Sequence, residues 1–331
     1  MEFRAIERGP GAFQQSVTAD QVRVMCRRVF GAQVRVVSAV ELGGGSYNST
    51  YRVDIGAERA VILRVAPEPA RQFRIEREWM RNEHAGVPYF APIAPLIPRT
   101  LAIDFTHEVI GRDYLFQSLL DGVPAPEGLA AYPRPEWAPF FRDMGSIARD
   151  IHAVRGTRFG PVAGPTFATW SEAVIASLDD TAADLEDVGL DATDVRDVAA
   201  AALQQRALFD EITQPRLLHG DLWTGNLMLA SGTPVPTITG VLDCDRTSWG
   251  DPESDWTIFV AGRRPGTERD AFWETYGSPA STPSAEQRLA FYRARHIGAV
   301  RLEGHRLGRS ESVSATYEDM RDVLARMDAR V

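Results

Sequence analysis

The residues best placed to do chemistry lie in one short polar stretch, HGDLWTGN at positions 219–226. Apolar residues flank this stretch on both sides, a pattern that predicts a strand, a tight loop and a second strand. A further apolar segment begins at Ile238 and ends in the carboxylates Asp243 and Asp245. The chain thus offers an acid and an amide within one loop, and more acids at the end of the next strand.

This arrangement matches the needs of phosphoryl transfer, which requires an acceptor hydroxyl in line with the γ-phosphate and cations over the phosphates. Asp221 would take the hydroxyl proton, and Asn226 follows it at the spacing found in the catalytic loop of protein kinases. Asn226 and Asp243 would bind Mg²⁺, which prefers hard oxygen ligands. His219 is expected to brace the loop through hydrogen bonds.

The plainer interpretation is a turn, because a lone H-x-D tripeptide usually forms an Asx hydrogen bond. Asparagine is scarce in this chain, however, and occurs only at positions 48, 82 and 226. Its presence at the required offset, together with the strand that ends at Asp243, favours the functional interpretation of Asp221, Asn226 and Asp243.

The segments HGDLWTGN and VLDCDRTSWGDPESDW, at 219–226 and 241–256, resemble the aminoglycoside phosphotransferase and choline kinase superfamily of small-molecule kinases. The HGDLW form is also similar to the fructosamine kinases within that superfamily. The resemblance implies an α+β, two-lobed, protein-kinase-like fold. Residues 1–120 would form a small N-terminal nucleotide-binding lobe with an antiparallel sheet and a helix. Residues 121–331 would form a larger, mainly helical lobe for catalysis and substrate binding.

The composition agrees with a globular chain of two lobes, since its 331 residues are 44% hydrophobic and 24% charged. The net charge of −9 argues against a general nucleic-acid binder. The chain contains no Lys, which excludes a Walker A loop. Cys26 and Cys244 lie far apart and indicate a reducing compartment. No stretch reaches the ~18 apolar residues of a membrane span, so we expect a cytoplasmic protein, monomeric or homodimeric.

The N-terminal region should contain a loose polar lead-in at residues 1–16, followed by a helix capped by Thr18 that ends at Phe30. Alternating residues at 34–40 predict a strand. The segment at 42–53 then combines a strand, a glycine-rich turn and a second strand.

Glycines in that turn would let backbone N–H groups approach an anion closely. A glycine-rich hairpin is ordinarily only a turn, but its place in the chain resembles the nucleotide-positioning loop of the superfamily. The resemblance therefore assigns Gly44, Gly45, Ser46 and Asn48 to contacts with the phosphates.

The strand expected at 60–65 carries one cation, Arg64, within an apolar run. In the superfamily this position usually carries a Lys or Arg that reaches the α- and β-phosphates, and Arg64 matches it. The alternative is a residue of an edge strand that extends its charged head into water. A Glu on the next helix, expected over 71–85, should orient this cation. Glu78 fits the superfamily pattern best, and Glu76 is the alternative.

Strands expected at 101–105 and 114–120 end where the superfamily has its hinge. The resemblance implies that backbone groups of Ser118 and Leu120 pair with the adenine base. The turn signal after residue 120 places the boundary between the lobes there.

Further helices are expected at 136–154, 170–185 and 195–212. His152 should pack inside its helix rather than act in catalysis. Asp251 can cap a helix that follows it, and relatives use acids such as Asp251 and Asp255 to support the catalytic loop. Asp245 is open between a second metal ligand, a substrate contact and a solvated charge.

The resemblance implies an ATP- and Mg²⁺-dependent kinase, with GTP as an open alternative, that phosphorylates a hydroxyl of a small-molecule acceptor. This acceptor would be an aminoglycoside or other antibiotic, an amino sugar or an amino alcohol, and a role in antibiotic resistance would follow. The alternative is a fructosamine- or ketosamine-type sugar kinase. Two other classes are a pseudokinase-like nucleotide-binding module and a metal hydrolase with His219, Asp221, Asp243 and Asp245 as ligands.

The charge of the acceptor stays open at this point, because acids and bases share the C-terminal region. The acids that could form a mouth for a cationic acceptor are Glu253, Asp255, Asp270 and Glu274. The bases that would suit a neutral or anionic acceptor are Arg263, Arg264, Arg301, His305 and Arg306.

Overall fold

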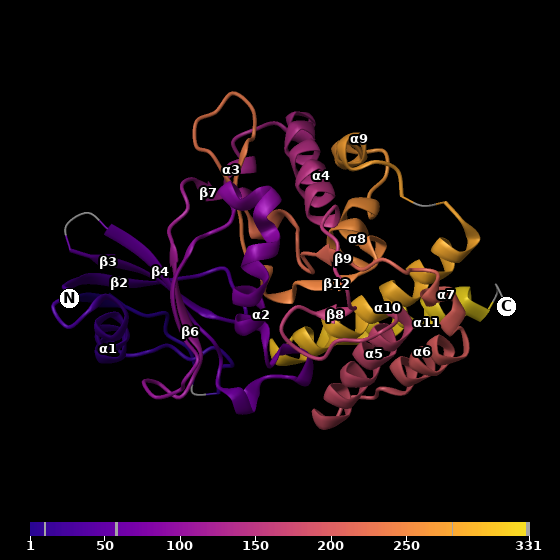
Figure 1. Ribbon diagram of the computed structural model, residues 1–331, viewed down its shortest axis with the longest axis horizontal. Helices are drawn as coiled ribbons and strands as arrows, with labels where there is room; N and C mark the ends of the chain where they lie inside the picture. Colours follow the sequence, from indigo (N-terminus) through magenta and orange to yellow (C-terminus); the bar gives the residue numbers. More distant parts are fainter. Residues whose placement is uncertain (10, 57–58, 280, 329–331) are drawn as a thin grey trace. The chain divides into compact units, whose positions relative to one another are not determined.

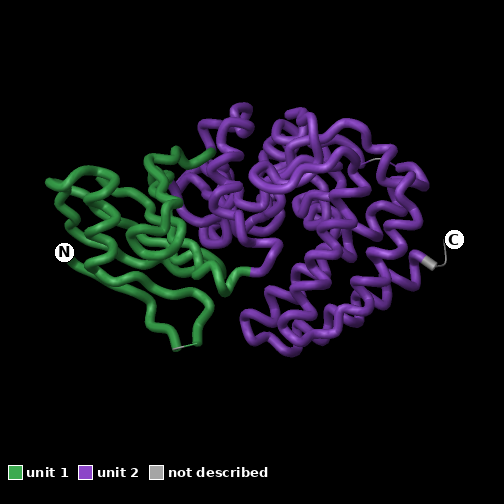
Figure 2. The backbone as a smooth tube through the Cα atoms, turned by 60° about the horizontal axis from the view of Figure 1, so that its bottom comes forward, with its two compact units in different colours: residues 1–72, 97–121 green, residues 73–96, 122–331 purple. Residues whose placement is uncertain are grey.

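The computed structural model describes residues 1–9, 11–56, 59–279 and 281–328 (Figure 1). By its internal contacts the chain forms two compact units (Figure 2). Unit 1 consists of Met1–Gln72 and Ile97–Asp121, and unit 2 of Phe73–Leu96 and Gly122–Val331. The sequence-based division placed residues 73–96 in the first lobe, whereas their contacts lie within unit 2.

The main element of unit 1 is a mostly antiparallel sheet in the order β1-β2-β3-β4-β6-β5. Its strands are β1 (Glu2–Arg4), β2 (Val36–Leu42), β3 (Ser49–Ile55), β4 (Arg59–Val65), β5 (Thr100–Asp104) and β6 (Tyr114–Ser118). The expectation of a loose lead-in is wrong for residues 2–4, since β1 pairs in parallel with β2 and Phe3 lies opposite Ala39. The edge of β2 offers backbone groups that the short N-terminal segment satisfies.

The helix expected after Thr18 is confirmed as α1 (Ala19–Phe30). Thr18 and Gln21 form a reciprocal capping box, which satisfies two backbone donors at the helix start. Val22 and Met25 are buried on the face that packs in the core of unit 1. The amphipathic spacing of this helix is therefore sufficient to explain its place against the sheet.

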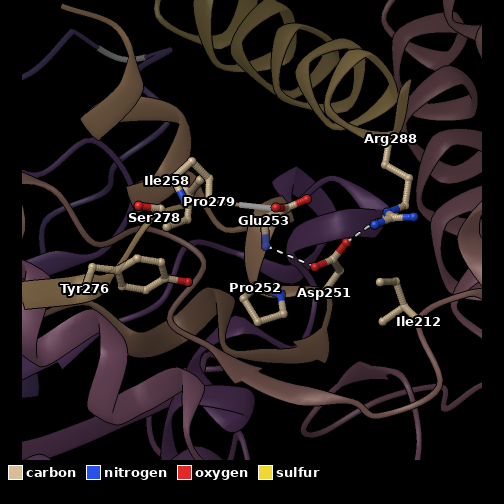
Figure 3. A pocket seen from close by; sticks show the side chains of 9 residues that line it. All are labelled: Ile212, Asp251, Pro252, Glu253, Ile258, Tyr276, Ser278, Pro279 and Arg288. Atoms are coloured by element: carbon tan, nitrogen blue, oxygen red, sulfur yellow. Dashed lines mark hydrogen bonds and ion pairs between the residues drawn. The ribbon is translucent and has the colours of Figure 1, made fainter. Parts of the chain in front are cut away.

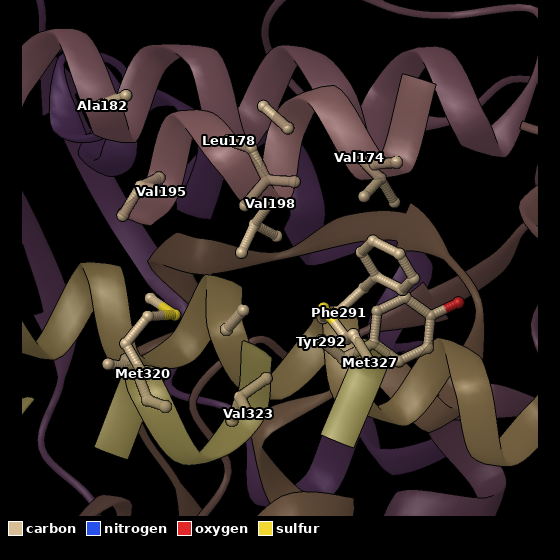
Figure 4. Packing of buried hydrophobic residues seen from close by; sticks show 14 of the residues in the cluster. Val174, Leu178, Ala182, Val195, Val198, Phe291, Tyr292, Met320, Val323 and Met327 are labelled. Carbon is tan, nitrogen blue, oxygen red and sulfur yellow. The ribbon is translucent and has the colours of Figure 1, made fainter. Parts of the chain in front are cut away.

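Helices and short 3₁₀ turns make up most of unit 2. The helices are α2 (Trp79–Gly86), α3 (Ala125–Leu129), α4 (Ala138–His152), α5 (Trp170–Asp187), α6 (Thr193–Gln204), α7 (Arg206–Asp210), α8 (Trp256–Gly262), α9 (Ala271–Tyr276), α10 (Pro283–Arg306) and α11 (Ser310–Asp328). No helix in the described ranges is long and apolar enough to cross a membrane. A hydrophobic core of unit 2 lies between α5, α6, α10 and α11, where Leu178, Val195, Phe291 and Met320 are fully or almost fully buried (Figure 4).

Two expected helices are interrupted in the structure. The segment 71–85 contains the 3₁₀ turn Arg74–Glu76 and only then α2. The N–H groups of Arg74 and Ile75 donate to the carboxylate of Asp184, at 3.0 and 3.3 Å, instead of forming α-helical bonds. The segment 195–212 is divided between α6 and α7, because Gln205 has a non-helical backbone (φ −105°, ψ 29°).

Two small sheets of unit 2 position the polar loops. Their orders are β11-β10-β7 and β8-β12-β9. The strands are β7 (Val123–Pro124), β8 (Gly160–Pro161), β9 (Arg216–Leu218), β10 (Leu227–Leu229), β11 (Ile238–Val241) and β12 (Ser248–Gly250). Leu227 lies opposite Val241 in one sheet, and Leu217 lies opposite Trp249 in the other. The two loops that join these strands, 219–226 and 242–247, are therefore held side by side.

Candidate active site

The register of β10 and β11 brings Asn226 next to Asp243. Asn226 immediately precedes β10, and its carbonyl accepts a 2.8 Å hydrogen bond from the N–H of Leu242. Asp243 comes next and has a left-handed backbone (φ 56°, ψ 54°). A left-handed conformation is uncommon outside glycine and often marks a functional position.

The amide of Asn226 fixes the loop that carries Asp221. Its Nδ2 donates to the backbone carbonyl of Asp221 at 2.8 Å and to the Asp221 carboxylate at 3.2 Å. Among the described residues Oδ1 of Asn226 has no hydrogen-bond donor. This orientation presents an amide oxygen beside the Asp243 segment, which is a donor set that suits Mg²⁺.

His219 is fully buried and braces the loop, as the sequence predicted. Its Nδ1 accepts a 3.2 Å hydrogen bond from the N–H of Asp221, and its Nε2 lies 3.5 Å from Sγ of Cys244. Burial lowers the pKa of His219 to about 4, so the imidazole is neutral near pH 7. Both ring nitrogens are engaged within the loops, which leaves neither for a metal ion.

The buried carboxylate of Asp255 fixes the start of the loop 219–226. It accepts hydrogen bonds from the N–H groups of His219 and Gly220, at 2.9 and 3.0 Å. His152 contacts the same carboxylate at 3.0 Å through Nε2 and Tyr276 at 2.8 Å through Nδ1. The expected structural role of His152 agrees with this geometry. Because Gly220 has φ +82° and a Cβ there would lie 2.4 Å from the carbonyl of Arg246, only glycine fits this turn.

The environment of Asp221 suits a group that exchanges a proton. Burial raises its pKa to about 6, the charge of Arg246 lowers it, and that of Asp243 raises it. Nη1 of Arg246 lies 3.7 Å from Oδ2 of Asp221, and their side chains are 35% and 17% exposed. The guanidinium also stacks on Trp79, 4.6 Å from the ring centroid. The carboxylate of Asp221 is therefore mostly, but not completely, shielded from bulk water.

Arg246, Trp79 and Asn82 were not among the site residues predicted from the sequence. Asn82 Nδ2 donates to the carbonyls of Asp245 and Thr247, at 2.8 and 2.7 Å, and so ties α2 to the second loop. A usable signal was present for Arg246, which is the one basic residue in the segment 241–256. The roles of Trp79 and Asn82 depend on tertiary packing that no local pattern encodes.

Four predicted phosphate-binding residues lie between β2 and β3 of unit 1. Gly44 has φ +97°, and a Cβ at Gly44 or Gly45 would meet nothing within 4 Å. Ser46 and Asn48 follow on the same turn, and Asn48 is buried with no hydrogen-bond partner for Oδ1 among the described residues. The turn is therefore open around its glycines and carries polar side chains beside them.

Arg64 is buried in the middle of the unit 1 sheet rather than on an edge. Its strand, β4, pairs with β3 on one side and β6 on the other, where Thr50 and Leu115 lie opposite Arg64. The edge-strand alternative is therefore wrong. Ser118 ends β6, and its N–H donates to the carbonyl of Arg99 at 2.9 Å. Leu120 lies in the loop that follows.

The two glutamates considered as partners of Arg64 have different surroundings in unit 2. Glu76 is buried and forms a 2.5 Å ion pair with Arg306. Glu78 is exposed at the start of α2 and forms a 3.7 Å ion pair with Arg81. The pairing of either glutamate with Arg64 stays a prediction.

A separate cavity of about 250 Å³ lies in unit 2, and Tyr276 is one of the residues that line it (Figure 3). Asp251 accepts from the N–H of Glu253 at 3.1 Å, which confirms its capping role, although the capped element is the 3₁₀ turn Pro252–Ser254. The cavity is lined by Ile212, Asp251, Pro252, Glu253, Ile258, Tyr276, Ser278, Pro279 and Arg288. It includes none of Asp221, Asn226 and Asp243, so its size carries no information about the loop chemistry.

Comparison with solved structures places the fold among aminoglycoside kinases. The GDP complex of a point mutant of aminoglycoside 2'-phosphotransferase-IIIa matches with a TM-score of 0.63 and 16% identity, over 95% of this chain and 100% of that chain. A thermostable mutant of APH(4)-Ia in its apo form matches with a TM-score of 0.63 and 20% identity, over 92% and 98%. The ternary complex of a further variant of that mutant with AMP-PNP and hygromycin B matches with a TM-score of 0.61 and 19% identity, over 92% of this chain and 98% of that chain. The expected α+β, protein-kinase-like fold is confirmed.

The sequence identifies the family, whereas the similar structures identify only the fold. Residues 38–292 match the phosphotransferase enzyme family, and the chain belongs to this family. No curated protein matches the sequence. The resemblance deduced from HGDLWTGN and the segment 241–256 is thereby confirmed at the level of the family.

Proposed function

We propose that this protein transfers the γ-phosphate of ATP, or of GTP, to a hydroxyl group of a small molecule. The observation that carries the proposal is the joint placement of Asp221, Asn226 and Asp243. Asn226 holds Asp221 through its amide, and its carbonyl holds the segment that leads into Asp243. An acid that can accept a proton thus lies beside two oxygen donors, as phosphoryl transfer requires.

Asp221 acts as the base in this proposal. Its pKa of about 6 leaves it mostly ionised at pH 7, yet close enough to neutrality to accept a proton readily. Asn226 keeps the carboxylate oriented, while Asp255 fixes the backbone on the other side of the loop. The acceptor hydroxyl would meet a carboxylate whose position is set by buried contacts.

Oxygen ligands for Mg²⁺ come from Asn226 and Asp243. The amide oxygen of Asn226 and the carboxylate of Asp243 fit the preference of this ion for hard oxygen donors. The bound ion would neutralise phosphate charge. The rival metal hydrolase is less well supported, because the described residues contain no group of three or more His, Cys, Asp or Glu placed to hold a metal.

The nucleotide phosphates would contact the turn between β2 and β3, through Gly44, Gly45, Ser46 and Asn48, and the cation of Arg64. The similar structures that contain GDP and AMP-PNP support nucleotide binding by this fold. Ser118 and Leu120 are proposed to contact the base. Since the N–H of Ser118 is already bonded to Arg99, its carbonyl is the better candidate for that contact.

The acceptor is a small-molecule alcohol, and two similar structures were solved with kanamycin or hygromycin B. A role in antibiotic resistance would require an antibiotic as acceptor. The HGDLW sequence supports the alternative of a fructosamine-type sugar kinase. The intact set Asp221, Asn226 and Asp243 argues against a pseudokinase-like binding module, which would not need all three.

The variant Asp221→Asn tests the proposal directly. ATP turnover with a panel of hydroxyl compounds should fall by about a thousandfold or more, while nucleotide affinity stays near that of the wild type. Asp210→Asn, a change at another unit 2 aspartate on α7, should leave turnover unchanged. Wild-type turnover in Asp221→Asn would exclude Asp221 as the base.

A further inference from the structure

The turn that is proposed to receive the nucleotide phosphates has little support within itself. Gly43, Gly44 and Gly45 are exposed, and a Cβ at Gly44 or Gly45 would meet no atom of the described chain within 4 Å. Glycines lose more conformational freedom on ordering than other residues do. Neighbouring segments must therefore hold this turn if it is to keep one shape before a ligand binds.

A segment from the N-terminal part of the chain lies along the second half of the turn. Residues 13–15 contact residues 47–49 in order: the rings of Phe13 and Tyr47 with centroids 5.6 Å apart, Gln14 Nε2 with the carbonyl of Asn48 at 2.8 Å, and the carbonyl of Gln15 with the hydroxyl of Ser49 at 3.1 Å. Residues 47–49 are all buried. The end of the turn is thus held by residues that lie 34 positions earlier in the chain.

The same segment is tied to the start of the turn. Glu41 comes just before the turn, and its side chain is fully buried. Its carboxylate accepts hydrogen bonds from the hydroxyl of Ser16 and the N–H of Ile6, both at 2.8 Å, and pairs with Arg8 at 2.6 Å. Residues 13–16, which we call the N-terminal brace, therefore contact both ends of the turn.

Buried groups of unit 1 fix the N-terminal brace in turn. Nη1 of the buried Arg112 donates to the carbonyl of Gln15 at 3.1 Å. The N–H of Val17, which directly follows the brace, donates to the hydroxyl of the buried Tyr51 at 3.0 Å. Because the brace is attached to the core of unit 1, it can restrain the turn rather than move with it.

Resting on the proposed function, we propose that Phe13 and Gln14 are positioning residues for the nucleotide phosphates. They hold Tyr47 and Asn48, and through them keep the backbone N–H groups of the glycine-rich turn where the phosphates bind. A turn that already has its bound shape loses less conformational entropy on binding, and this increases affinity. The brace thus contributes to nucleotide affinity from outside the turn.

Calorimetric titration of the protein with AMP-PNP and Mg²⁺ tests the proposal. Phe13→Ala removes the aromatic contact with the turn, and should raise the Kd for AMP-PNP by about fivefold or more. Phe13→Tyr keeps the ring and should stay within about twofold of the wild type. Gln14→Ala leaves the aromatic pair in place and removes the hydrogen bond to Asn48. It should raise the Kd by about threefold or more, and it tests the same role if Phe13→Ala does not fold.

Phe30→Ala is the matched control for a loss of stability. It removes another half-buried ring of unit 1, whose centroid lies 5.1 Å from that of Phe116, in a pair that includes no residue of the turn. Urea unfolding should show a lower stability in Phe30→Ala and in Phe13→Ala, whereas only Phe13→Ala should lose nucleotide affinity. An equal loss of affinity in the two variants would mean that Phe13 contributes stability alone.

The inference and the proposed function fail in different ways. A wild-type Kd for AMP-PNP in both Phe13→Ala and Gln14→Ala would overturn the inference and leave the proposed function intact. If the wild-type protein itself binds no AMP-PNP with Mg²⁺ and releases no ADP from ATP with any hydroxyl compound, the proposed function is wrong, and the inference fails with it.

Discussion

Burial raises the pKa of Asp221, and the charges of neighbouring residues set the size of the shift. Burial raises its pKa from 3.8 to about 6, Arg246 opposes the shift, and Asp243 adds to it. The pKa of Asp221 is higher in the folded state than in the unfolded state. Between about pH 4 and pH 6 the folded protein therefore binds more protons than the unfolded chain. Folding stability therefore declines as the pH rises through this window, because the folded protein must then hold the ionised carboxylate of Asp221 in a partly buried site.

The pH profile of the reaction should reflect this equilibrium. Below pH 6, kcat/KM should fall about tenfold per pH unit as Asp221 of the free protein becomes protonated. Arg246→Ala should move this acid limb to higher pH, because the cation that lowers the pKa of Asp221 is gone. Arg246→Lys, which keeps a positive charge, should move it less. A limb that stays in place in Arg246→Ala would show that another group controls the profile.

Gly220 provides a second prediction at the residue scale. Gly232→Ala places a side chain at φ +71° with nothing within 4 Å, and should cost about 1–2 kcal/mol. Gly220→Ala has a similar φ of +82° and adds a contact of 2.4 Å with a backbone oxygen. It should lower the free energy of unfolding by at least about 1 kcal/mol more than Gly232→Ala. Equal losses in urea titrations would mean that the loop relaxes around the new methyl group.

At the scale of elements, the residue before α8 and the end of α4 together support the loop 219–226. Asp255 accepts from two loop N–H groups and contacts His152 of α4, which in turn contacts Tyr276 of α9. Four segments distant in the sequence thus share one buried network. Such a network is costly to disturb, because each group is satisfied only by the others.

The network predicts a graded response to substitution. Asp255→Asn replaces one carboxylate oxygen, which accepts from a backbone N–H, by an NH₂ group that cannot accept. It should lower the free energy of unfolding by about 3 kcal/mol and reduce kcat as well. Tyr276→Phe removes only the contact to His152, and should cost about 1 kcal/mol. Thermal or urea unfolding measured beside kcat distinguishes the two. A larger loss in Tyr276→Phe than in Asp255→Asn would contradict the assigned order.

Local patterns were enough to predict the elements that carry the chemistry. The apolar segments around HGDLWTGN and before Asp243 form strands as expected, and Thr18 begins a capped helix. The break in 71–85 was not foreseen because Asp184, a hundred residues away in the chain, binds its backbone. Trp79 and Asn82 were missed for the same reason, since only tertiary packing brings α2 against the second loop.

At the scale of the molecule, unit 2 contains more of the proposed machinery than the sequence suggested. Residues 73–96 belong to it by their contacts, and Asn82 of α2 holds the carbonyls of Asp245 and Thr247. The helix that was expected to serve the nucleotide lobe therefore supports the loop 242–247, which contains Asp243. Its sequence alone could not show this, because a short amphipathic helix can pack on either unit.

This support predicts an effect of Asn82 on the loop 242–247, which contains Asp243. Asn82→Ala removes two hydrogen bonds to carbonyls and one from the N–H of Ala163. It should cost about 2–3 kcal/mol of stability and weaken Mg²⁺-dependent nucleotide binding. Calorimetric titration of AMP-PNP with and without Mg²⁺ measures the effect. Binding with wild-type Mg²⁺ dependence would show that α2 contributes stability alone.

The central claim is that Asp221, Asn226 and Asp243 converge at the phosphates of a bound nucleotide. A crystal structure of the protein with Mg²⁺ and AMP-PNP tests it most directly. We expect the cation to be bound by Oδ1 of Asn226 and the carboxylate of Asp243, with the γ-phosphate facing Asp221. A nucleotide whose phosphates lie away from these three side chains, or a cation held by other residues, would contradict the account.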